Sequence, residues 1–227
     1  MTMKTIKTDG IYYLEQVSAG SDWYWGEDYN SGDLYEAEEL YKDKKSIKPN
    51  RLILVHCPDG EVIEPIKLTE GQYIGRPSLY YDHKVHVVMV DFTKQQIHLL
   101  SFNPDEILSG GSVNSLDILP LSCVEDCYNL MLKGTPVILT RESYKQYFQI
   151  LWCLEEGCMN VGFQLEDNES FSHREDDKLY FSSWWETEDP EYEYHEEVIV
   201  RDLQGKILER FEGGIQEVRP GEYYVLQ

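Results

Sequence analysis

Two stretches decide the fold, GQYIGRPSLYY at residues 71–81 and GIQEVRPGEYY at residues 214–224, because both fit the pattern G-x4-R-P-x2-Y-Y without a gap. A second matching pair lies upstream, LILVHCPDGEVIE at 52–64 and EVIVRDLQGKILE at 197–209. Each member of this pair is an apolar run, a polar break that ends in glycine, and another apolar run, which is typical of a β-hairpin. The sequence therefore contains an internal repeat in which a hairpin is followed by another strand.

The hairpin pattern recurs twice more in a weaker form. QILWCLEEGCMNVGF at 149–163 places Gly157 at its turn, and QIHLLSFNPDEIL at 96–108 is predicted to turn at residues 103–105. The four turns fall near residues 60, 105, 157 and 205, a spacing of roughly 45–50 residues. A period of this size is typical of repeat architectures.

A further strand is predicted before each hairpin. DHKVHVVMVD at 82–91 and DDKLYFSSWW at 176–185 share the pattern D-x-K-[VL]-[HY]. DGIYYLEQ at 9–16 is similar to them, and GTPVILT at 134–140 takes the fourth position. Each repeat unit thus predicts four strands: the R-P-x2-Y-Y strand, this strand and the two arms of the hairpin.

The two ends of the chain complement each other in this scheme. The chain begins on the second strand of a unit and ends on the first, so residues 222–227 are predicted to pair beside residues 10–16 in one sheet. A ring closed in this way resembles the β-propeller architecture, in which only short protected edges remain. The resemblance implies an all-β fold of about four blades with four antiparallel strands each. Five blades are possible if residues 17–49 form most of one, and a β-sandwich is the alternative.

The predicted organisation is a single domain over residues 1–227. The repeat units are predicted at 214–227 together with 10–67, then at 68–121, 122–166 and 167–213. Residues 17–49 are interpreted as an insertion in the first unit, and AEELYKDKK within it is typical of a short helical turn or an exposed loop.

Acidic residues dominate the charge. Lys and Arg number 20 against 42 Asp and Glu, a formal net charge of −22. Such a field repels nucleic acid and anionic membrane surfaces and attracts basic proteins and peptides, although it also serves solubility alone. We therefore expect no nucleic-acid partner and no membrane partner.

The cysteines are odd in number: Cys57, Cys123, Cys127, Cys153 and Cys158. The polar start of the chain shows no signal peptide, and no apolar run is long enough to span a membrane, so reduced thiols in a cytoplasmic protein are expected. Cys153 and Cys158 flank a hairpin turn, where a disulfide or a shared ligand role is geometrically conceivable. Because the spacings differ from the C-x2-C of zinc sites, we expect no metal and no cofactor.

Aromatic residues beside acids are the best functional lead, since the sequence has no P-loop, no G-x-G-x-x-G and no G-x-S-x-G. One cluster follows the second strand of the first unit and the other follows the second strand of the last unit. Aromatic faces stack on sugars or cations, and carboxylates bind amines and hydroxyls. The alternative is that the tryptophans pack between sheets. The predicted binding residues are Asp22, Trp23, Trp25, Glu27, Trp184, Trp185 and Glu186.

Three functions are compatible with these features. The first is a non-enzymatic binding module, favoured as a monomer, that holds a basic protein or peptide, or a small ligand. The second is a carbohydrate-active enzyme with paired carboxylates near the tryptophans. The third is an acidic decoy that masks a basic surface. No residue is singled out as catalytic. The repeated Arg76 and Arg219 are interpreted as structural, each pairing with a carboxylate and stacking on a tyrosine such as Tyr80 or Tyr223.

Overall fold

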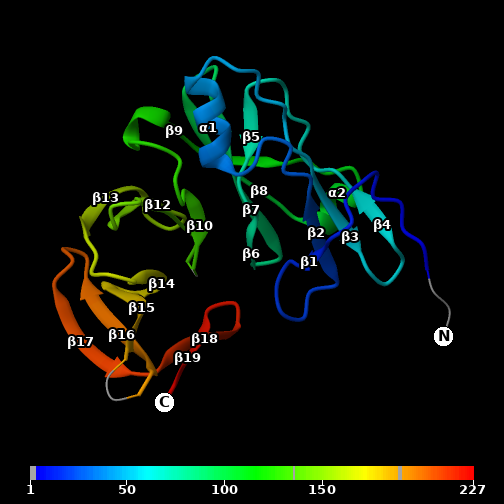
Figure 1. Ribbon diagram of the computed structural model, residues 1–227. Helices are drawn as coiled ribbons and strands as arrows, with labels where there is room; N and C mark the ends of the chain where they lie inside the picture. The colour runs from blue at the N-terminus through cyan, green and yellow to red at the C-terminus, as the bar shows by residue number, and fades with distance from the viewer. Residues whose placement is uncertain (1–3, 135, 189–190) are drawn as a thin grey trace. The chain divides into compact units, whose positions relative to one another are not determined.

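The computed structural model describes residues 4–134, 136–188 and 191–227 (Figure 1). The chain divides into two compact units, Met1–Cys127 and Tyr128–Gln227. Within the described residues the backbone is mostly β and forms five antiparallel sheets, none of which closes on itself. The all-β class and the recurring four-stranded sheet are thereby confirmed. The prediction of a single domain over 1–227 is not tested and stays a prediction.

The described residues of unit 1 form two sheets and two α-helices. The first sheet has the strand order β1-β2-β3-β4, and the second has the order β5-β7-β8-β9 with β6 also paired to β7. The elements are β1 (Glu15–Gln16), β2 (Trp23–Glu27), α1 (Leu34–Lys42), β3 (Leu52–His56), β4 (Glu61–Ile63), β5 (Gln72–Ile74), β6 (Ser78–Tyr81), β7 (Lys84–Asp91), β8 (Gln96–Phe102), α2 (Pro104–Leu108), β9 (Asn114–Pro120) and the 3₁₀ turn η1 (Leu121–Cys123).

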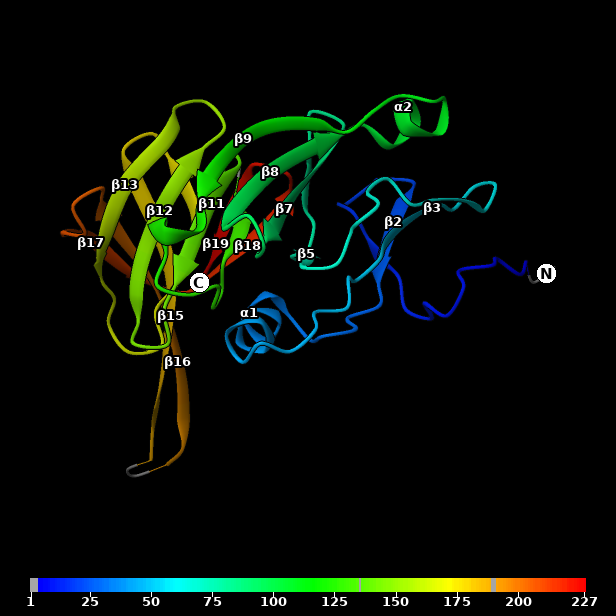
Figure 2. The same cartoon turned by 90° about the horizontal axis from the view of Figure 1, so that it is seen from above.

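The described residues of unit 2 form two four-stranded sheets, each a simple meander, and a two-stranded sheet. Their strands are β10 (Met131–Lys133), β11 (Ile138–Glu142), β12 (Tyr147–Cys153) and β13 (Gly157–Gln164); β14 (Ser170–Glu175), β15 (Lys178–Thr187), β16 (Glu193–Asp202) and β17 (Ile207–Glu212); and β18 (Gly214–Arg219) and β19 (Glu222–Leu226). Figure 2 shows the β15–β16 pair extending past the other strands of its sheet.

The core of unit 1 explains the continuous apolar run of β3. Leu52 and Leu54 pack in one cluster with Trp23 and residues of β5, β7 and β8. Ile53 packs on the other face of the strand, with residues of the N-terminal segment. Because successive side chains of a strand point to opposite faces, a strand buried on both faces is apolar at every position.

The core of unit 2 is built on four phenylalanines. Phe148, Phe163, Phe171 and Phe181 come from β12, β13, β14 and β15, and the rings that are in contact have centroids 5.0 to 6.0 Å apart. Tilted and edge-on ring pairs of this kind contribute about 0.5–1.5 kcal/mol each beyond the burial of area. The cluster therefore joins the two meander sheets of this unit.

A stack of three rings attaches the C-terminal hairpin to β14 and β15. His173 lies between Tyr180 and Tyr223, with centroid distances of 4.5 and 3.6 Å and nearly parallel planes. Burial lowers the pKa of His173 to about 4, so its imidazole is neutral at pH 7. Tyr223, one of the tyrosines of the repeated motif, thus packs on a histidine.

Three of the four predicted hairpin turns are confirmed. Gly60, Gly157 and Gly205 lie at the β3–β4, β12–β13 and β16–β17 turns, with φ of 86°, 76° and 82°. Positive φ is nearly free of steric cost for glycine alone, which explains the glycine at the end of each polar break.

The fourth predicted hairpin, at 96–108, is wrong. Asn103 caps α2 by accepting a hydrogen bond from Asp105 N at 2.9 Å, and Pro104 occupies the first turn of that helix. Pro at this position is compatible with a helix start because its missing N–H needs no partner there. β8 pairs with β7 on one side, and the strand that pairs with it on the other side is β9, at Asn114–Pro120.

The first predicted unit also differs from expectation. Only Glu15–Gln16 of residues 9–16 is a strand, and the position next to β3 is taken by β2 from within the predicted insertion 17–49. Of the two interpretations of AEELYKDKK, a helical turn or an exposed loop, the helical one is confirmed by α1. Within unit 1, β1 pairs with β2, and within unit 2, β19 pairs with β18. The predicted pairing of 222–227 with 10–16 would join the two units and stays a prediction.

The two R-P-x2-Y-Y stretches have different structures. Residues 214–224 form the β18–β19 hairpin, whereas β5 and β6 both pair with β7. Arg76 forms an ion pair with Glu15 and lies 5.4 Å from the ring centre of Trp25, so it stacks on a tryptophan. Arg219 is 79% exposed and lies 3.7 Å from the carboxylate of Glu222. The side chain of Tyr80 lies outside the described residues.

Candidate functional site

The candidate site is the end of the β15–β16 pair that extends beyond the neighbouring strands β14 and β17. It consists of Trp184–Thr187 and Glu193–Glu196 and is here called the arm. β14 follows β15 only as far as Ser182, and β17 follows β16 only as far as Glu197. In the described part of the chain no other strand pairs with the arm, which appears in Figure 2 as a two-stranded extension. The arm is therefore a two-stranded ribbon whose outer edges have no strand partner among the described residues.

Cross-strand contacts between aromatic side chains hold the arm together. Strand register places Trp185 opposite His195 and Trp184 opposite Glu196. The rings of Trp185 and His195 are stacked at 5.1 Å, and those of Trp184 and Tyr194 at 6.0 Å. Aromatic cross-strand pairs stabilise a strand pair by about 0.2–1 kcal/mol each. These contacts help the two strands stay paired where no third strand lies beside them.

One face of the arm carries carboxylates that tyrosines hold in place. Trp184, Glu186, Tyr194 and Glu196 share this face, because register pairs and alternate residues lie on the same side. The hydroxyl of Tyr194 donates to Glu196 at 3.0 Å, and that of Tyr192 donates to Glu186 at 2.6 Å. The face therefore presents two oriented anions beside an indole ring.

On the opposite face of the arm, the side chain of His195 contacts other residues of the arm. His195 stacks on Trp185, its Nε2 lies 3.2 Å from the Thr187 hydroxyl, and the same nitrogen lies 3.6 Å from Glu193. The two faces thus differ: the Trp184 face offers carboxylates to a ligand, and the Trp185 face holds a histidine.

The arm and its tip are strongly acidic. The sequence between Ser182 and Val198 contains no Lys or Arg. Its acidic residues are Glu186, Glu188, Asp189, Glu191, Glu193, Glu196 and Glu197. Trp184 and Trp185 are 42% and 40% exposed. Exposed indole beside dense negative charge is suited to a cationic partner.

The structure separates the two predicted clusters by burial. Trp184, Trp185 and Glu186 are exposed, as a binding role requires, although binding itself stays a prediction. Trp23 and Trp25 are only 2% and 7% exposed and belong to the core of unit 1. Their indole faces are covered by apolar side chains, so they are packing residues.

Asp22 is exposed, whereas Glu27 is enclosed in a polar network inside unit 1. Asn50 donates from its amide to Glu27 Oε1 and to Ile74 O, and accepts from Ile74 N at 2.9 Å. Burial raises the pKa of Glu27 to about 8, against the lowering effect of hydrogen bonds from Tyr29 and Asn50. Glu27 is therefore largely protonated at pH 7 and connects β2 to β5.

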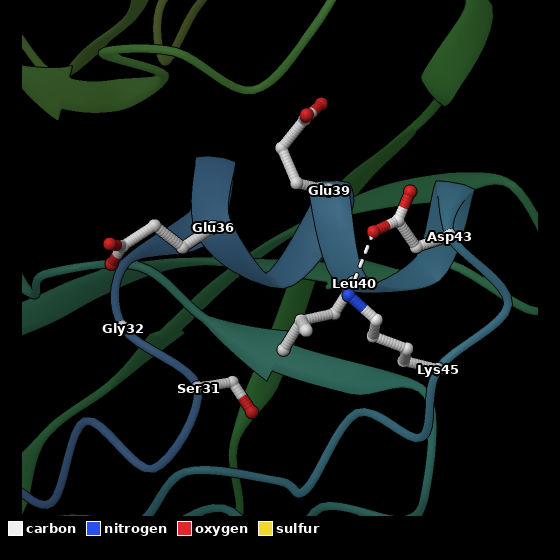
Figure 3. A pocket seen from close by; sticks show the side chains of 7 residues that line it. All are labelled: Ser31, Gly32, Glu36, Glu39, Leu40, Asp43 and Lys45. Carbon is white, nitrogen blue, oxygen red and sulfur yellow. Dashed lines mark hydrogen bonds and ion pairs between the residues drawn. The ribbon is translucent and has the colours of Figure 1, made fainter.

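A shallow cavity of about 420 Å³ lies beside α1 (Figure 3). Its carboxylates are engaged within unit 1: Glu36 accepts from Asp33 N at 3.0 Å in the helix cap, and Asp43 pairs with Lys45 at 2.9 Å. The third acid, Glu39, pairs with Lys42 of α1 at 3.5 Å. All three acids of the cavity thus have partners in or beside the helix, so the cavity is a weaker candidate than the arm.

Metal and thiol chemistry receive no support from the described residues. No group of three or more His, Cys, Asp or Glu side chains is placed to hold a metal ion in that part of the chain. Cys153 pairs with Gly157 and Cys158 with Trp152, so the two side chains lie on opposite faces of their hairpin and are not placed to form a disulfide with each other. None of the described helices is long and apolar enough to cross a membrane.

Tyr194, His195 and Glu196 of β16, and Tyr192 just before it, are not among the predicted binding residues. They complete the arm and its tip, yet no motif in the sequence marks them. The available signal was the alternation of acids and aromatics in EYEYHEE at 191–197, which is typical of a strand with two unlike faces.

Comparisons with known proteins give little further guidance. No family model matches the sequence, and no curated protein matches it. Among solved structures, the chain is similar to the crystal structure of Porphyromonas gingivalis dipeptidyl peptidase 4, with a TM-score of 0.41 and 10% sequence identity. The likeness covers 77% of this chain and 25% of that one, so this chain spans about a quarter of the peptidase chain. A likeness at this level carries no inference about activity.

Proposed function

We propose that this protein is an acidic binding module whose arm holds a basic protein or peptide. The observation that supports the proposal is the exposed ribbon itself, in which Trp184 and Trp185 stand among carboxylates without a Lys or Arg. A cation over an indole ring contributes about 0.5–2 kcal/mol, and the net charge of −22 favours encounter with a positive partner.

The test measures binding of a basic peptide by calorimetry, with a neutral peptide of equal length as the ligand control. In the key variant, residues 184–196 are replaced by Asn-Gly, which suits a two-residue hairpin turn and leaves the Ser183–Glu197 pair to close it. We expect this variant to lose binding while its unfolding temperature stays close to that of the parent.

Salt dependence and a second variant complete the test. Because exposed charges are screened within about 10 Å at 0.1 M salt, affinity should fall steeply between 0.05 and about 0.5 M salt. Tyr12→Ala removes a 96% exposed aromatic residue of unit 1 and should bind as the parent does. Binding that survives loss of the arm, or that ignores salt, refutes the proposal.

A regulatory form of the same proposal is an acidic decoy that masks the basic surface of another protein. This form also depends on the arm and on the negative charge. It differs because it predicts that the protein competes with nucleic acid for the same basic surface. The protein should displace nucleic acid from a basic binding protein in a gel-shift assay, and the form without the arm should not. Failure to displace leaves simple binding as the function.

The carbohydrate-active alternative is not favoured by any contact of the arm. Glycoside hydrolysis needs two carboxyl groups about 5–10 Å apart on either side of the scissile bond. Glu186 and Glu196 instead lie on one face of an open ribbon, each bound by a tyrosine hydroxyl. We therefore prefer binding to catalysis.

For the architecture, we propose that the four larger sheets are blades of a propeller. Support comes from the strand order β10-β11-β12-β13 and β14-β15-β16-β17, since each sheet is a meander of consecutive strands, as in propeller blades. A crystal structure with these sheets stacked face to face in two layers would identify the β-sandwich instead.

A further inference from the structure

A small cavity lies at the base of the arm, on the side of β16 that faces β18. It has a volume of about 200 Å³, and its lining includes Trp184, Glu196, Glu197, Gly213 and Gly214. A water molecule occupies about 30 Å³ of liquid, so the cavity holds about seven water-sized groups. The side chain of arginine has a comparable number of non-hydrogen atoms.

The carboxylate of Glu196 is held in place at this cavity. Its Oε1 accepts the hydrogen bond of Tyr194, whose ring stacks on Trp184, and its backbone carbonyl accepts from Gly213 N at 3.0 Å. Side chain and backbone are thus fixed from two directions. An anion positioned in this way loses little conformational entropy when it binds a cation.

Gly214 makes room for that carboxylate. A Cβ atom added at Gly214 would lie 2.8 Å from Glu196 Oε2, closer than such contacts occur in proteins. The backbone of Gly214 does not have positive φ, so alanine is compatible with its conformation. The side chain of any other residue at this position would push the carboxylate out of place.

The two acids of the cavity differ in their partners. Glu197 accepts from Arg210 Nη1 at 2.6 Å, which balances its charge. Glu196 has no such ion pair in the described part of the chain. A cation that enters the cavity therefore finds one indole face and one carboxylate whose charge is not balanced by an ion pair.

We propose that this cavity takes one arginine side chain of the basic partner, with the guanidinium on Glu196 and against the face of Trp184. The inference rests on the proposed binding function and adds the residue type that the site selects. Arginine suits the site better than lysine because its planar guanidinium stacks on an aromatic face and donates two parallel hydrogen bonds to a carboxylate.

The experiment measures, by calorimetry, the affinity of a basic peptide with one central arginine. The same peptide is made with lysine or with citrulline at that position, since citrulline keeps the shape of arginine without its charge. We expect citrulline to weaken binding about 10- to 100-fold, as for loss of a hydrogen bond to a charged group, and lysine to weaken it less. Equal affinity of all three peptides would overturn the proposal.

Variants of the protein locate the site. Glu196→Gln and Gly214→Ala should each weaken the arginine peptide about tenfold or more and leave the citrulline peptide nearly unaffected. Trp184→Ala should weaken the arginine peptide more than Trp185→Ala, whose ring lies on the other face of the arm. The charge-matched control is Glu61→Gln, an exposed residue of unit 1.

The outcomes separate this inference from the broader function. If the basic peptide needs the arm but Glu196→Gln and Trp184→Ala bind it as the parent does, the arginine site is wrong and the binding module stands. If the protein without the arm binds equally well, the proposed function itself fails. If Gly214→Ala does not fold, which circular dichroism would reveal, Glu196→Gln decides the question.

Discussion

Replacing Glu27 by glutamine should stabilise unit 1, and the gain should grow with pH. Glu27 lies at the end of β2, where Asn50 joins it to β5. Burial raises the pKa of its carboxyl group from 4.5 to about 8. Glutamine keeps the oxygen that accepts from Asn50 and carries no ionisable proton, so it removes the cost of ionisation and retains the contact.

The sign of the effect follows from the two pKa values. Below pH 4.5 the carboxyl group is protonated in both the folded and the unfolded chain, and its contribution to stability is fully present. Between pH 4.5 and about 8 the unfolded chain ionises and the folded chain does not, so the stability of the parent falls as pH rises. Above about 8 the loss is complete.

The magnitude follows from about 1.4 kcal/mol for each pH unit between the two values, which gives an upper limit of roughly 4–5 kcal/mol. Because Glu27 retains some access to water, we expect Glu27→Gln to gain about 2–4 kcal/mol at pH 9 and close to nothing at pH 4.5. The exposed Glu61→Gln is the matched control and should show no such gain.

The assay is urea unfolding of parent and variants at pH 4.5, 7 and 9, followed by tryptophan fluorescence, since Trp23 and Trp25 are buried in the same core. A difference between Glu27→Gln and parent that stays constant from pH 4.5 to 9 would refute the reasoning. A gain at pH 4.5 would show that the amide packs better for reasons unrelated to charge.

Two further predictions concern unit 2. Glu169→Gln should destabilise this unit by about 3–5 kcal/mol in urea unfolding, because it removes the counter-charge of the buried Arg201 guanidinium. Arg201 is 5% exposed and donates to the Glu169 carboxylate from Nε and Nη2, each at 2.6 Å. A loss below about 1 kcal/mol would mean that water replaces the carboxylate. Gly205→Ala should lower the melting temperature, because φ is 82° there and a Cβ would lie 2.3 Å from Phe163. Gly157→Ala, with φ of 76° and open space around it, should cost only about 1 kcal/mol. Equal losses of stability would show that backbone strain alone determines the effect of both substitutions.

Local patterns predicted the hairpins well because their turns depend on neighbouring residues. Glycine at the end of a polar break requires only positive φ, and Gly60, Gly157 and Gly205 have it. The same kind of signal failed at Asn103-Pro104, since this dipeptide both initiates turns and starts helices. The choice between them depends on where β9 pairs, which is set far along the chain.

The candidate site was predictable in part. Trp23 and Trp25 are two residues apart, so both point to one face of β2, and that face is the core. Trp184 and Trp185 are adjacent, so their side chains point to opposite faces of β15. Both are exposed here because this part of β15 extends beyond the strands on either side of its sheet. That depends on β14 and β17 ending early, a property of other segments that no motif around the tryptophans encodes.

The stack of Tyr180, His173 and Tyr223 gives the C-terminal hairpin a built-in reporter. Two aromatic rings above and below an imidazole shift its proton resonances upfield, so the His173 signals in an NMR spectrum distinguish an attached hairpin from a detached one. Segments that open one at a time do so below the free energy of global unfolding. The histidine signals would therefore report detachment of β18–β19 while the phenylalanine core of unit 2 is still intact.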